Sequence, residues 1–209
     1  MYTYVITIAR GFGSGGKEIG SKLADRLHIP CYESQILKMA SEETGLSEQL
    51  FREVDEKLKG GYLINKLNHM RFPMEVAPTE KKFISNNNLF LIQSRIIQEL
   101  ARSQSCIILG KCADVVLSTF PNVVSVYVDA PEADCVASIM RKLQISEERA
   151  RDLVRKTDRY RSDYYKCYSK GKNWKNPDNY ELVLNSAKVG RDRCVDVLEY
   201  YVKTKFNLD

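Results

Sequence analysis

The glycine-rich segment RGFGSGGKEI, at residues 10–19, limits most strongly what this chain can fold into. It follows a short, apolar, β-branched run at residues 4–9, which predicts a buried strand. After it, Ile19, Leu23 and Leu27 recur every four residues, which predicts a helix that Pro30 closes. A simple turn needs only one left-handed position, and four glycines at residues 11–16 exceed that need. The segment therefore indicates a strand–loop–helix unit built around a ligand.

The segment fits the phosphate-loop pattern G-x-x-x-x-G-K-[ST] at Gly11, Gly16 and Lys17. In such a loop, successive backbone N–H groups point at phosphate oxygens and the helix N-terminus adds partial positive charge. The lysine reaches the transferred phosphate. The last position normally offers a hydroxyl to magnesium, but here it is Glu18, and Ser14 is the nearest hydroxyl. We favour this interpretation over a plain glycine-rich turn.

The segment also fits the dinucleotide fingerprint G-x-G-x-x-G at Gly11, Gly13 and Gly16. Glu33 lies at roughly the spacing expected of the acid that binds a ribose. Little strand can be drawn before Glu33, and a dinucleotide loop has no specific use for Lys17. An NAD(P)-dependent oxidoreductase is therefore the weaker alternative.

Strands and helices are expected to alternate along the rest of the chain. The expected strands are residues 106–109, 123–128 and 180–184. The expected helices are residues 33–40, 47–58, 89–102, 131–143, a long one from 146, and 191–203. This order predicts a three-layer α/β/α fold with a parallel sheet of about five strands. Residues 59–88, which contain Gly60-Gly61, two prolines and a helical piece near residues 63–70, are expected to form a mobile insertion.

Positive charge is concentrated in one part of the chain. The net charge of +5 is too weak to imply a nucleic-acid partner, but residues 141–175 contain 12 Lys or Arg against 5 Asp or Glu. In the helix that follows Ser146, a period of 3.6 places five residues on one side: Arg151, Arg155, Asp158, Arg161 and Tyr165. The opposite side, expected to pack, holds Leu153, Tyr160, Tyr164 and Cys167. The first side can grip phosphates through its guanidinium groups, or it is a solvated face of ion pairs.

The composition excludes several other classes of protein. Apolar runs are too short to cross a bilayer, and the N-terminus is typical of a first strand and not of a signal peptide. Six scattered cysteines without a Cys-x-x-Cys pair, and only two histidines, do not indicate a zinc site. Such cysteines suit a reducing compartment, so a cytoplasmic location is expected.

Several motifs resemble the cytidylate kinase-like family, whose members are relatives of the nucleoside monophosphate kinases. The matching segments are ITIARGFGSGGKEIG at residues 6–20, LHIPCYE at 27–33, CIILGKCAD at 106–114, VYVDAP at 126–131, TDRYRSDYY at 157–165, Trp174, and NYEL at 179–182. The resemblance covers nearly the whole chain. It implies a phosphate-loop kinase fold that uses ATP and magnesium.

The resemblance also implies roles for individual residues. The ATP phosphates would contact Gly11, Phe12, Gly13, Ser14, Gly15, Gly16, Lys17 and Glu18. Arg151 and Arg155 would be lid arginines that act with Lys17 on the transferred group. The acceptor would contact Glu33, Lys111, Asp114, Asp158 and Arg161. Residues 185–190 would lie near the adenine, and magnesium would arrive with the nucleotide, with Ser14 or Asp129 as possible protein contacts.

One kinase domain is therefore expected over residues 1–209. Its core would comprise residues 1–58, 89–140 and 178–209, with an acceptor-side insertion at about 59–88 and a lid at about 141–177. The expected reaction moves the ATP γ-phosphoryl group to a nucleoside monophosphate of the CMP or dCMP type, or to a related small acceptor. Small nucleotides are the expected partners, without nucleic acid or membrane. Because Glu18 replaces the loop hydroxyl, a nucleotide-binding protein without transfer activity is the alternative.

Overall fold

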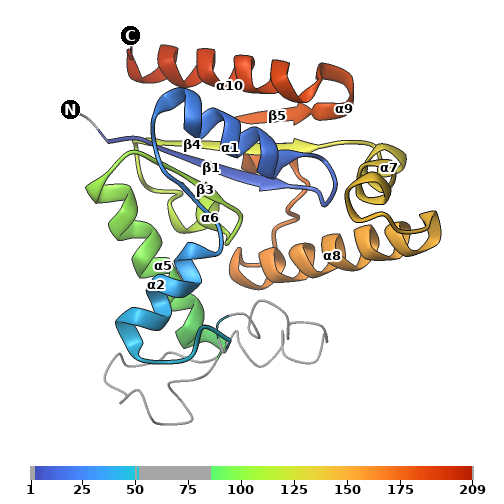
Figure 1. The fold of residues 1–209 in the computed structure, drawn as a ribbon. Coiled ribbons are helices and arrows are strands. Elements are labelled where there is room, and N and C mark those ends of the chain that lie inside the picture. Colours follow the sequence, from blue (N-terminus) through green and yellow to red (C-terminus); the bar gives the residue numbers. More distant parts are fainter. Residues whose placement is uncertain (1–2, 50, 52–85, 209) are drawn as a thin grey trace.

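The computed structural model describes residues 3–49, 51 and 86–208 (Figure 1). Five parallel strands form one sheet in the order β2-β3-β1-β4-β5. The strands are β1 (Val5–Arg10), β2 (Cys31–Tyr32), β3 (Cys106–Leu109), β4 (Val123–Asp129) and β5 (Leu182–Asn185). The helices are α1 (Gly16–Leu27), α2 (Gln35–Thr44), α5 (Asn86–Ser103), α6 (Ala113–Val116), α7 (Glu132–Leu143), α8 (Glu147–Tyr168), α9 (Ser186–Val189) and α10 (Arg191–Phe206). A short 3-10 helix covers Pro177–Asn179.

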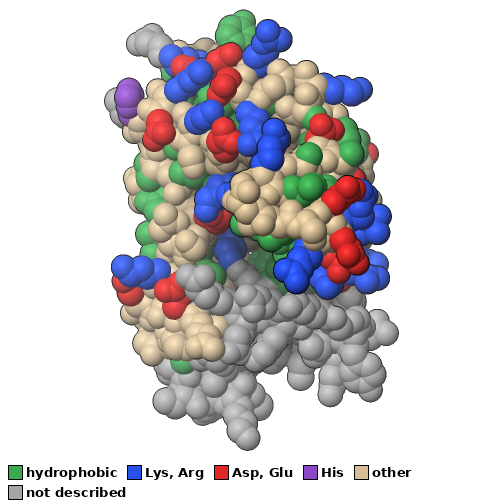
Figure 2. Space-filling view, turned by 45° about the vertical axis from the view of Figure 1, so that its right-hand side comes forward, with side chains coloured by type: hydrophobic (Ala, Val, Ile, Leu, Met, Phe, Trp, Pro, Cys, Tyr) green, Lys and Arg blue, Asp and Glu red, His purple; other side chains and the backbone are tan. Residues whose placement is uncertain are grey.

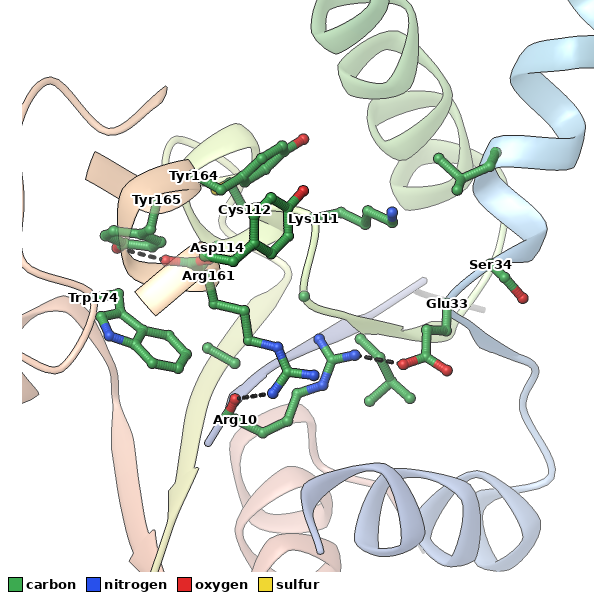
Figure 3. A pocket seen from close by; sticks show the side chains of 15 residues that line it. Arg10, Glu33, Ser34, Lys111, Cys112, Asp114, Arg161, Tyr164, Tyr165 and Trp174 are labelled. Carbon is green, nitrogen blue, oxygen red and sulfur yellow. Dashed lines mark hydrogen bonds and ion pairs between the residues drawn. The ribbon is translucent and has the colours of Figure 1, made fainter. Parts of the chain in front are cut away.

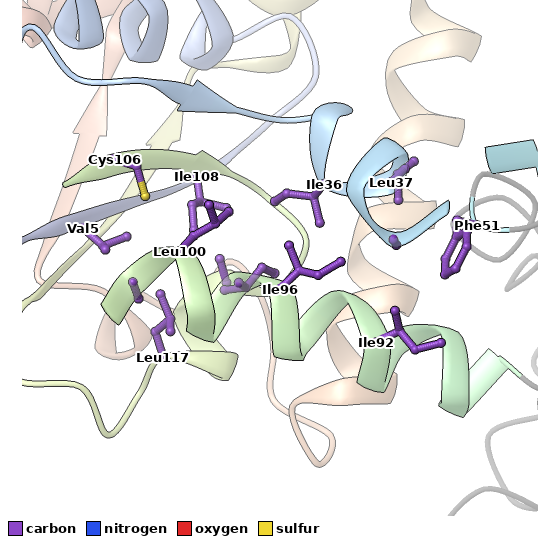
Figure 4. Close-up of a cluster of buried hydrophobic side chains, with 14 of the residues drawn as sticks. Val5, Ile36, Leu37, Phe51, Ile92, Ile96, Leu100, Cys106, Ile108 and Leu117 are labelled. Carbon is purple, nitrogen blue, oxygen red and sulfur yellow. The ribbon is translucent and has the colours of Figure 1, made fainter. Parts of the chain in front are cut away.

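Helices cover both faces of this sheet, which confirms the predicted three-layer fold. In Figure 1, α1 and α10 lie on one face, and α2 and α5 lie on the other. Successive side chains of the central strand β1 point to opposite faces of the sheet, so both faces of this strand must be covered. Ile6 and Ile8 are buried toward α1 and α10, whereas Val5 packs with α2 and α5. Figure 4 shows the buried cluster on the side of α2 and α5, in which Ile96 of α5 packs near Ile108 of β3.

The strand order separates this fold from the dinucleotide-binding one. In the classic dinucleotide-binding order, the first two strands are neighbours. Here β3 lies between β1 and β2, and β1 pairs on its other side with β4. The order therefore contradicts the dinucleotide interpretation of the glycine-rich segment.

Element boundaries differ from expectation where a single residue changes the backbone course. The first helix ends at Leu27 because His28 adopts a left-handed conformation with φ 52°, two residues before Pro30. Cys31 and Tyr32 form a real strand beside β3, although the segment is very short. Glu33 precedes α2 and does not belong to it. The last strand begins at Leu182 and not at residue 180.

Other expectations are extended or lie outside the described residues. Helices α5, α8 and α10 occur close to their predicted ranges, whereas α6 and α9 were not predicted. Of the helix expected at residues 47–58, only residues 48, 49 and 51 are described as helical. The insertion expected at residues 59–88 lies outside the described residues up to residue 85. Among the residues that are described, no helix has the length and apolar character needed to cross a membrane.

Candidate active site

The glycine loop, residues 11–15, joins the end of β1 to the start of α1 at the centre of the sheet. Gly13 and Gly15 have φ angles of 91° and 83°, a region that L side chains rarely adopt. A Cβ at Gly13 would lie 2.6 Å from the carbonyl oxygen of Cys135 in α7. Sterics therefore require glycine here, and the loop places the first N–H groups of α1 at the carboxyl edge of the sheet. That edge is where open α/β sheets bind ligands.

The Ser14 hydroxyl lies inside this loop. It is buried and donates to the Gly11 carbonyl oxygen at 2.8 Å, while the Gly16 N–H points back to it at 3.4 Å. The Ser14 carbonyl oxygen accepts from the hydroxyl of Ser186, which also donates to the Asp129 carbonyl oxygen at 3.2 Å. Ser14 thus closes the loop, and Ser186 ties the loop to the end of β4.

Lys17 and Arg10 both form ion pairs with Glu33. The carboxylate oxygens of Glu33 lie 2.5 Å from Arg10 Nη2 and 2.5 Å from Lys17 Nζ. Burial alone would raise the pKa of Glu33, but the contacts with Lys17 and Arg10 outweigh it and hold the pKa below its usual value. Glu33 is therefore placed against the loop lysine.

Glu18 points to a different set of partners. Its carboxylate lies 3.0 Å from Lys22 Nζ and 2.5 Å from Arg191 Nη1. Arg191 also donates to the Ser138 hydroxyl at 2.7 Å, and its guanidinium lies where a side chain on Gly15 would be. The contacts with Lys22 and Arg191 lower the pKa of Glu18. Sequence reasoning missed Arg191, although it directly follows the segment 185–190 expected near the adenine.

Two pockets meet beside the glycine loop. The larger, the loop pocket, has a volume of about 920 Å³ and is bounded by the loop, the start of α1, α7 and Arg191. The smaller, the helix pocket, has a volume of about 290 Å³ and lies between α2 and α8 over the ends of β1 and β3 (Figure 3). Three residues line both pockets: Arg10, Glu33 and Arg161.

The helix pocket collects four of the five residues expected to contact an acceptor: Glu33, Lys111, Asp114 and Arg161. Lys111 has a φ of 59°, so the chain turns sharply as it leaves β3. Asp114 accepts from the Tyr165 hydroxyl at 2.8 Å, and burial raises the pKa of this carboxyl. The hydroxyl of Tyr164 is buried at the same pocket and has no hydrogen-bond partner within the described part of the chain. The pocket thus offers basic groups near the loop and a polar aromatic wall farther away.

The aromatic residues of this region both pack and line the pocket. Tyr127 on β4 stacks on Tyr180 with centroids 5.2 Å apart and meets Trp174 edge-on at 5.5 Å. Phe90 of α5 stacks on Tyr168 at 3.7 Å. The Tyr180 hydroxyl donates to the Trp174 carbonyl oxygen. Tyr180 therefore belongs to this aromatic packing, and β5 begins only at Leu182.

Asp158, the fifth expected acceptor contact, lies against the glycine loop and does not line the helix pocket. Its carboxylate accepts from the Phe12 N–H at 2.7 Å. Arg161 Nη1 donates to the Arg10 carbonyl oxygen at 2.9 Å, and its guanidinium lies 5.5 Å from the centre of the Phe12 ring. Burial, with Arg10 nearby, lowers the pKa of Arg161 to about 10, and burial raises the pKa of Asp158. This turn of α8 therefore holds the loop in place.

Arg151 and Arg155 lie apart from both pockets. Arg155 is exposed and Arg151 is partly exposed. Both form ion pairs with Glu132, at 3.2 Å for Arg151 and 3.1 Å for Arg155, and Arg151 also pairs with Glu147. Figure 2 shows acidic and basic side chains interspersed over this part of the surface. The arginines expected on one face of α8 are thus divided between two environments.

The division corrects the predicted helix face. The inward stripe of α8 runs through Ala150, Val154, Arg161 and Tyr165, with spacings of four and seven residues. Tyr165 was expected beside Arg151, but it is buried. The side predicted to pack is confirmed, because Tyr164 is buried and Leu153, Tyr160 and Cys167 pack against buried clusters. The position predicted for Tyr165 was wrong, because contacts with α7 and the sheet determine which residues of α8 are buried.

Asp129, the expected metal contact, ends β4 directly beside the loop. Its Oδ1 would lie 2.8 Å from a Cβ on Gly11, and its Oδ2 lies 3.9 Å from Lys175 Nζ. Asp129 and Ser14 are the two side chains that the sequence offered to magnesium. The Ser14 hydroxyl is buried and bonded within the loop, whereas the Asp129 side chain is 35% exposed. Within the described ranges, no cluster of three or more His, Cys, Asp or Glu could hold a metal ion alone.

Comparison with known proteins gives one family and a consistent fold. The model of the cytidylate kinase-like family matches residues 5–188. An uncharacterized protein from Eubacterium ventriosum has a similar structure, with a TM-score of 0.70, 23% identity, and coverage of 96% of this chain and 99% of that chain. Shikimate kinase from Bacteroides thetaiotaomicron gives a TM-score of 0.52 at 11% identity, with coverage of 96% and 98%. No curated protein matches the chain in sequence.

Proposed function

The chain belongs to the cytidylate kinase-like family, and from this premise we propose that it transfers the γ-phosphoryl group of ATP to a nucleoside monophosphate of the CMP or dCMP type. The family supports the broader class, a nucleotide-kinase-type phosphotransferase. The observation that carries the proposal is the junction of the two pockets. The loop pocket would take ATP, the helix pocket would take the acceptor, and Arg10, Glu33 and Arg161 line both.

Phosphoryl transfer needs positioning and charge neutralisation, and involves little covalent chemistry by the protein. The N–H groups of the glycine loop and of the start of α1 would bind the phosphates of ATP. Lys17 is 65% exposed, so it can leave Glu33 and turn to the γ-phosphate. Asp158 and Arg161 would keep the loop in shape through the Phe12 N–H and the Arg10 carbonyl oxygen.

Magnesium fits this site as a companion of the nucleotide. When bound, it supplies charge neutralisation at the transferred group. Of the two side chains that could contact it, Asp129 is partly exposed beside the loop, whereas the Ser14 hydroxyl is buried and already bonded. We therefore assign Asp129, and not Ser14, to that contact.

We assign residues 141–177 to a lid. Arg151 and Arg155 are held at Glu132 by exposed ion pairs, which contribute little stability. When the lid closes over a bound nucleotide, these two arginines would leave Glu132 and contact the transferred phosphoryl group. Closure would also exclude water. The exchange requires little free energy because neither arginine is buried in its present position.

A second function is favoured by one specific observation. No hydroxyl of the glycine loop faces outward, because Glu18 stands at the last position of the pattern and Ser14 is buried. A protein that binds nucleotide without transferring phosphate would have the same loop. This alternative predicts tight binding of ADP or ATP and no turnover with any acceptor.

The test is ADP release from Mg-ATP with CMP, dCMP, UMP, AMP and GMP in turn. Lys17-dependent turnover with one acceptor supports the kinase and identifies its substrate. The Lys17→Ala variant should lose about 10²–10³-fold in turnover, the usual cost of removing one charge-stabilising donor. Lys38→Ala is the matched control, because Lys38 is exposed on α2 and forms an ion pair with Glu42, away from both pockets. Turnover that survives in Lys17→Ala would refute the loop assignment, and silence with retained ATP binding would favour the second function.

A further inference from the structure

Two guanidinium groups lie side by side where the two pockets meet. Figure 3 shows the ends of Arg10 and Arg161 next to each other, facing the helix pocket. Their side chains are only 12% and 24% exposed. The lowered pKa of Arg161 has burial as its first cause and the charge of Arg10 as its second. Like charges at this burial are unfavourable unless an anion compensates for them.

The described carboxylates compensate for these charges incompletely. Glu33 pairs with Arg10 and, at the same time, with Lys17. The carboxylate of Asp158 lies 3.9 Å from Arg161, and the same Asp158 oxygen already accepts from the Phe12 N–H. A guanidinium has five donors in a fixed fork, and one of those of Arg161 is used on a carbonyl oxygen. The junction thus retains donor capacity for one more oxyanion.

The position of Arg10 is built into the fold. A Cβ on Gly110, which has a φ of 72°, would collide with Arg10 Nη1. A Cβ on Gly16 would lie 2.5 Å from Arg10 Cβ. Both ends of the side chain are therefore packed against glycines, which hold the guanidinium over the end of β3. Sequence reasoning assigned Arg10 no contact with a substrate.

We propose that Arg10 and Arg161 form a subsite for an oxyanion of the acceptor, and that the Glu33 carboxylate is an internal anion that holds this subsite until the acceptor replaces it. The proposal rests on the proposed function, because it places the acceptor in the helix pocket. A phosphate monoester fits the two forks and the charge of Lys17. A carboxylate shares this chemistry. Either group would release Glu33 from Arg10 at the moment when the acceptor is in place.

The test measures anion binding without turnover. The protein is saturated with a non-hydrolysable ATP analogue, so that the glycine loop cannot bind the probe. Inorganic phosphate or acetate is then titrated by calorimetry. Glu33→Gln should bind phosphate about tenfold more tightly than the unchanged protein, because the competing charge is gone. Arg10→Met should weaken phosphate binding about tenfold. The double variant Glu33→Gln with Arg10→Met should not show the increased phosphate affinity expected of Glu33→Gln alone.

Matched variants separate this effect from general changes in charge. Arg26→Met and Glu199→Gln remove an exposed ion pair between α1 and α10, outside both pockets, and should leave phosphate binding unchanged. Arg10→Lys keeps the charge and loses the fork, so it should fall between the unchanged protein and Arg10→Met. If Arg10→Met does not fold, Arg10→Lys replaces it as the test of the Arg10 contact.

Phosphate affinity that is equal in the unchanged protein, Glu33→Gln and Arg10→Lys would overturn the subsite. Phosphate bound more tightly than acetate supports a phosphate monoester as acceptor, and the reverse order supports a carboxylate. If the subsite responds as expected while no nucleoside monophosphate is phosphorylated, the proposed function fails and the subsite stands.

Discussion

Gly13 lies where the glycine loop passes the backbone of α7. Its φ of 91° and the 2.6 Å distance that a Cβ would have to the Cys135 carbonyl oxygen are two separate demands for glycine. Gly171 has a similar φ of 88°, but a Cβ there would meet no atom of the described residues within 4 Å. The two positions therefore separate backbone strain from a steric clash.

We expect Gly13→Ala to destabilise the protein more than Gly171→Ala. The left-handed conformation alone costs roughly 1–2 kcal/mol in a residue with a Cβ, which is the expected loss for Gly171→Ala. Gly13→Ala adds the clash with α7, for an expected total of about 3 kcal/mol. Chemical denaturation of both variants checks this order, and equal losses would contradict the close approach at Cys135.

At the scale of elements, α8 performs two tasks along its length. Its last turns bring Arg161 and Tyr165 to the glycine loop and the helix pocket, whereas its first half packs on α7 through Ala150 and Val154. The residues on its exposed side, among them Arg155, are free of the sheet. The lid proposed above therefore depends on the first half of α8, whereas the second half contacts the glycine loop.

Arg155→Ala should lower kcat more than it raises the KM for ATP. The lid contact forms mainly in the transition state if Arg155 leaves Glu132 only on closure. We expect a decrease in kcat of about 10²-fold, within the range known for single charged donors. Lys156→Ala is the neighbouring control, because Lys156 forms an exposed i,i+4 ion pair with Asp152 along α8 itself. Equal kinetics in the two variants, or a lost melting transition in Arg155→Ala, would point to a structural role.

At the scale of the whole molecule, ionisation at the pocket junction affects global stability. The pKa of Glu33 is lowered in the folded state from an ordinary value of 4.5, because its contacts with Lys17 and Arg10 outweigh burial. A lowered carboxyl pKa contributes stability that is complete above the ordinary value and is lost as pH falls through the folded-state value. The raised pKa values of Asp114 and Asp158 act in the opposite direction.

The unchanged protein should therefore lose its stability advantage over Glu33→Gln in acid. Because Asp114 and Asp158 are present in both proteins, the difference between them isolates Glu33. The difference in unfolding free energy should be largest near about pH 6 and should shrink toward about pH 3. Urea denaturation across this interval measures it, with Glu199→Gln as the control. A difference that does not change with pH would contradict the ion pairs of Glu33.

Local sequence patterns determined the strand–loop–helix unit, the α/β class and most element positions. The reason is that these follow from neighbouring residues: the period of two in β1, the repeat of Ile19 and Leu23, and the glycines of the loop. The family resemblance, and not these local patterns, assigned Glu33, Lys111, Asp114 and Arg161 to an acceptor. All four line the helix pocket, and the first three do so because segments that follow parallel strands meet at one edge of the sheet.

The pairing of the charged groups depends on the tertiary fold. Asp158 reaches the Phe12 N–H across 146 positions of the chain, and Arg191 reaches Glu18 across 173. Such partners depend on strand order and on which side of α8 is buried, and helix periodicity records neither. The partners of Glu33 could not be predicted from sequence spacing for the same reason. Its spacing fitted a ribose-binding acid, but the insertion of β3 between β1 and β2 placed its carboxylate against Arg10 and Lys17.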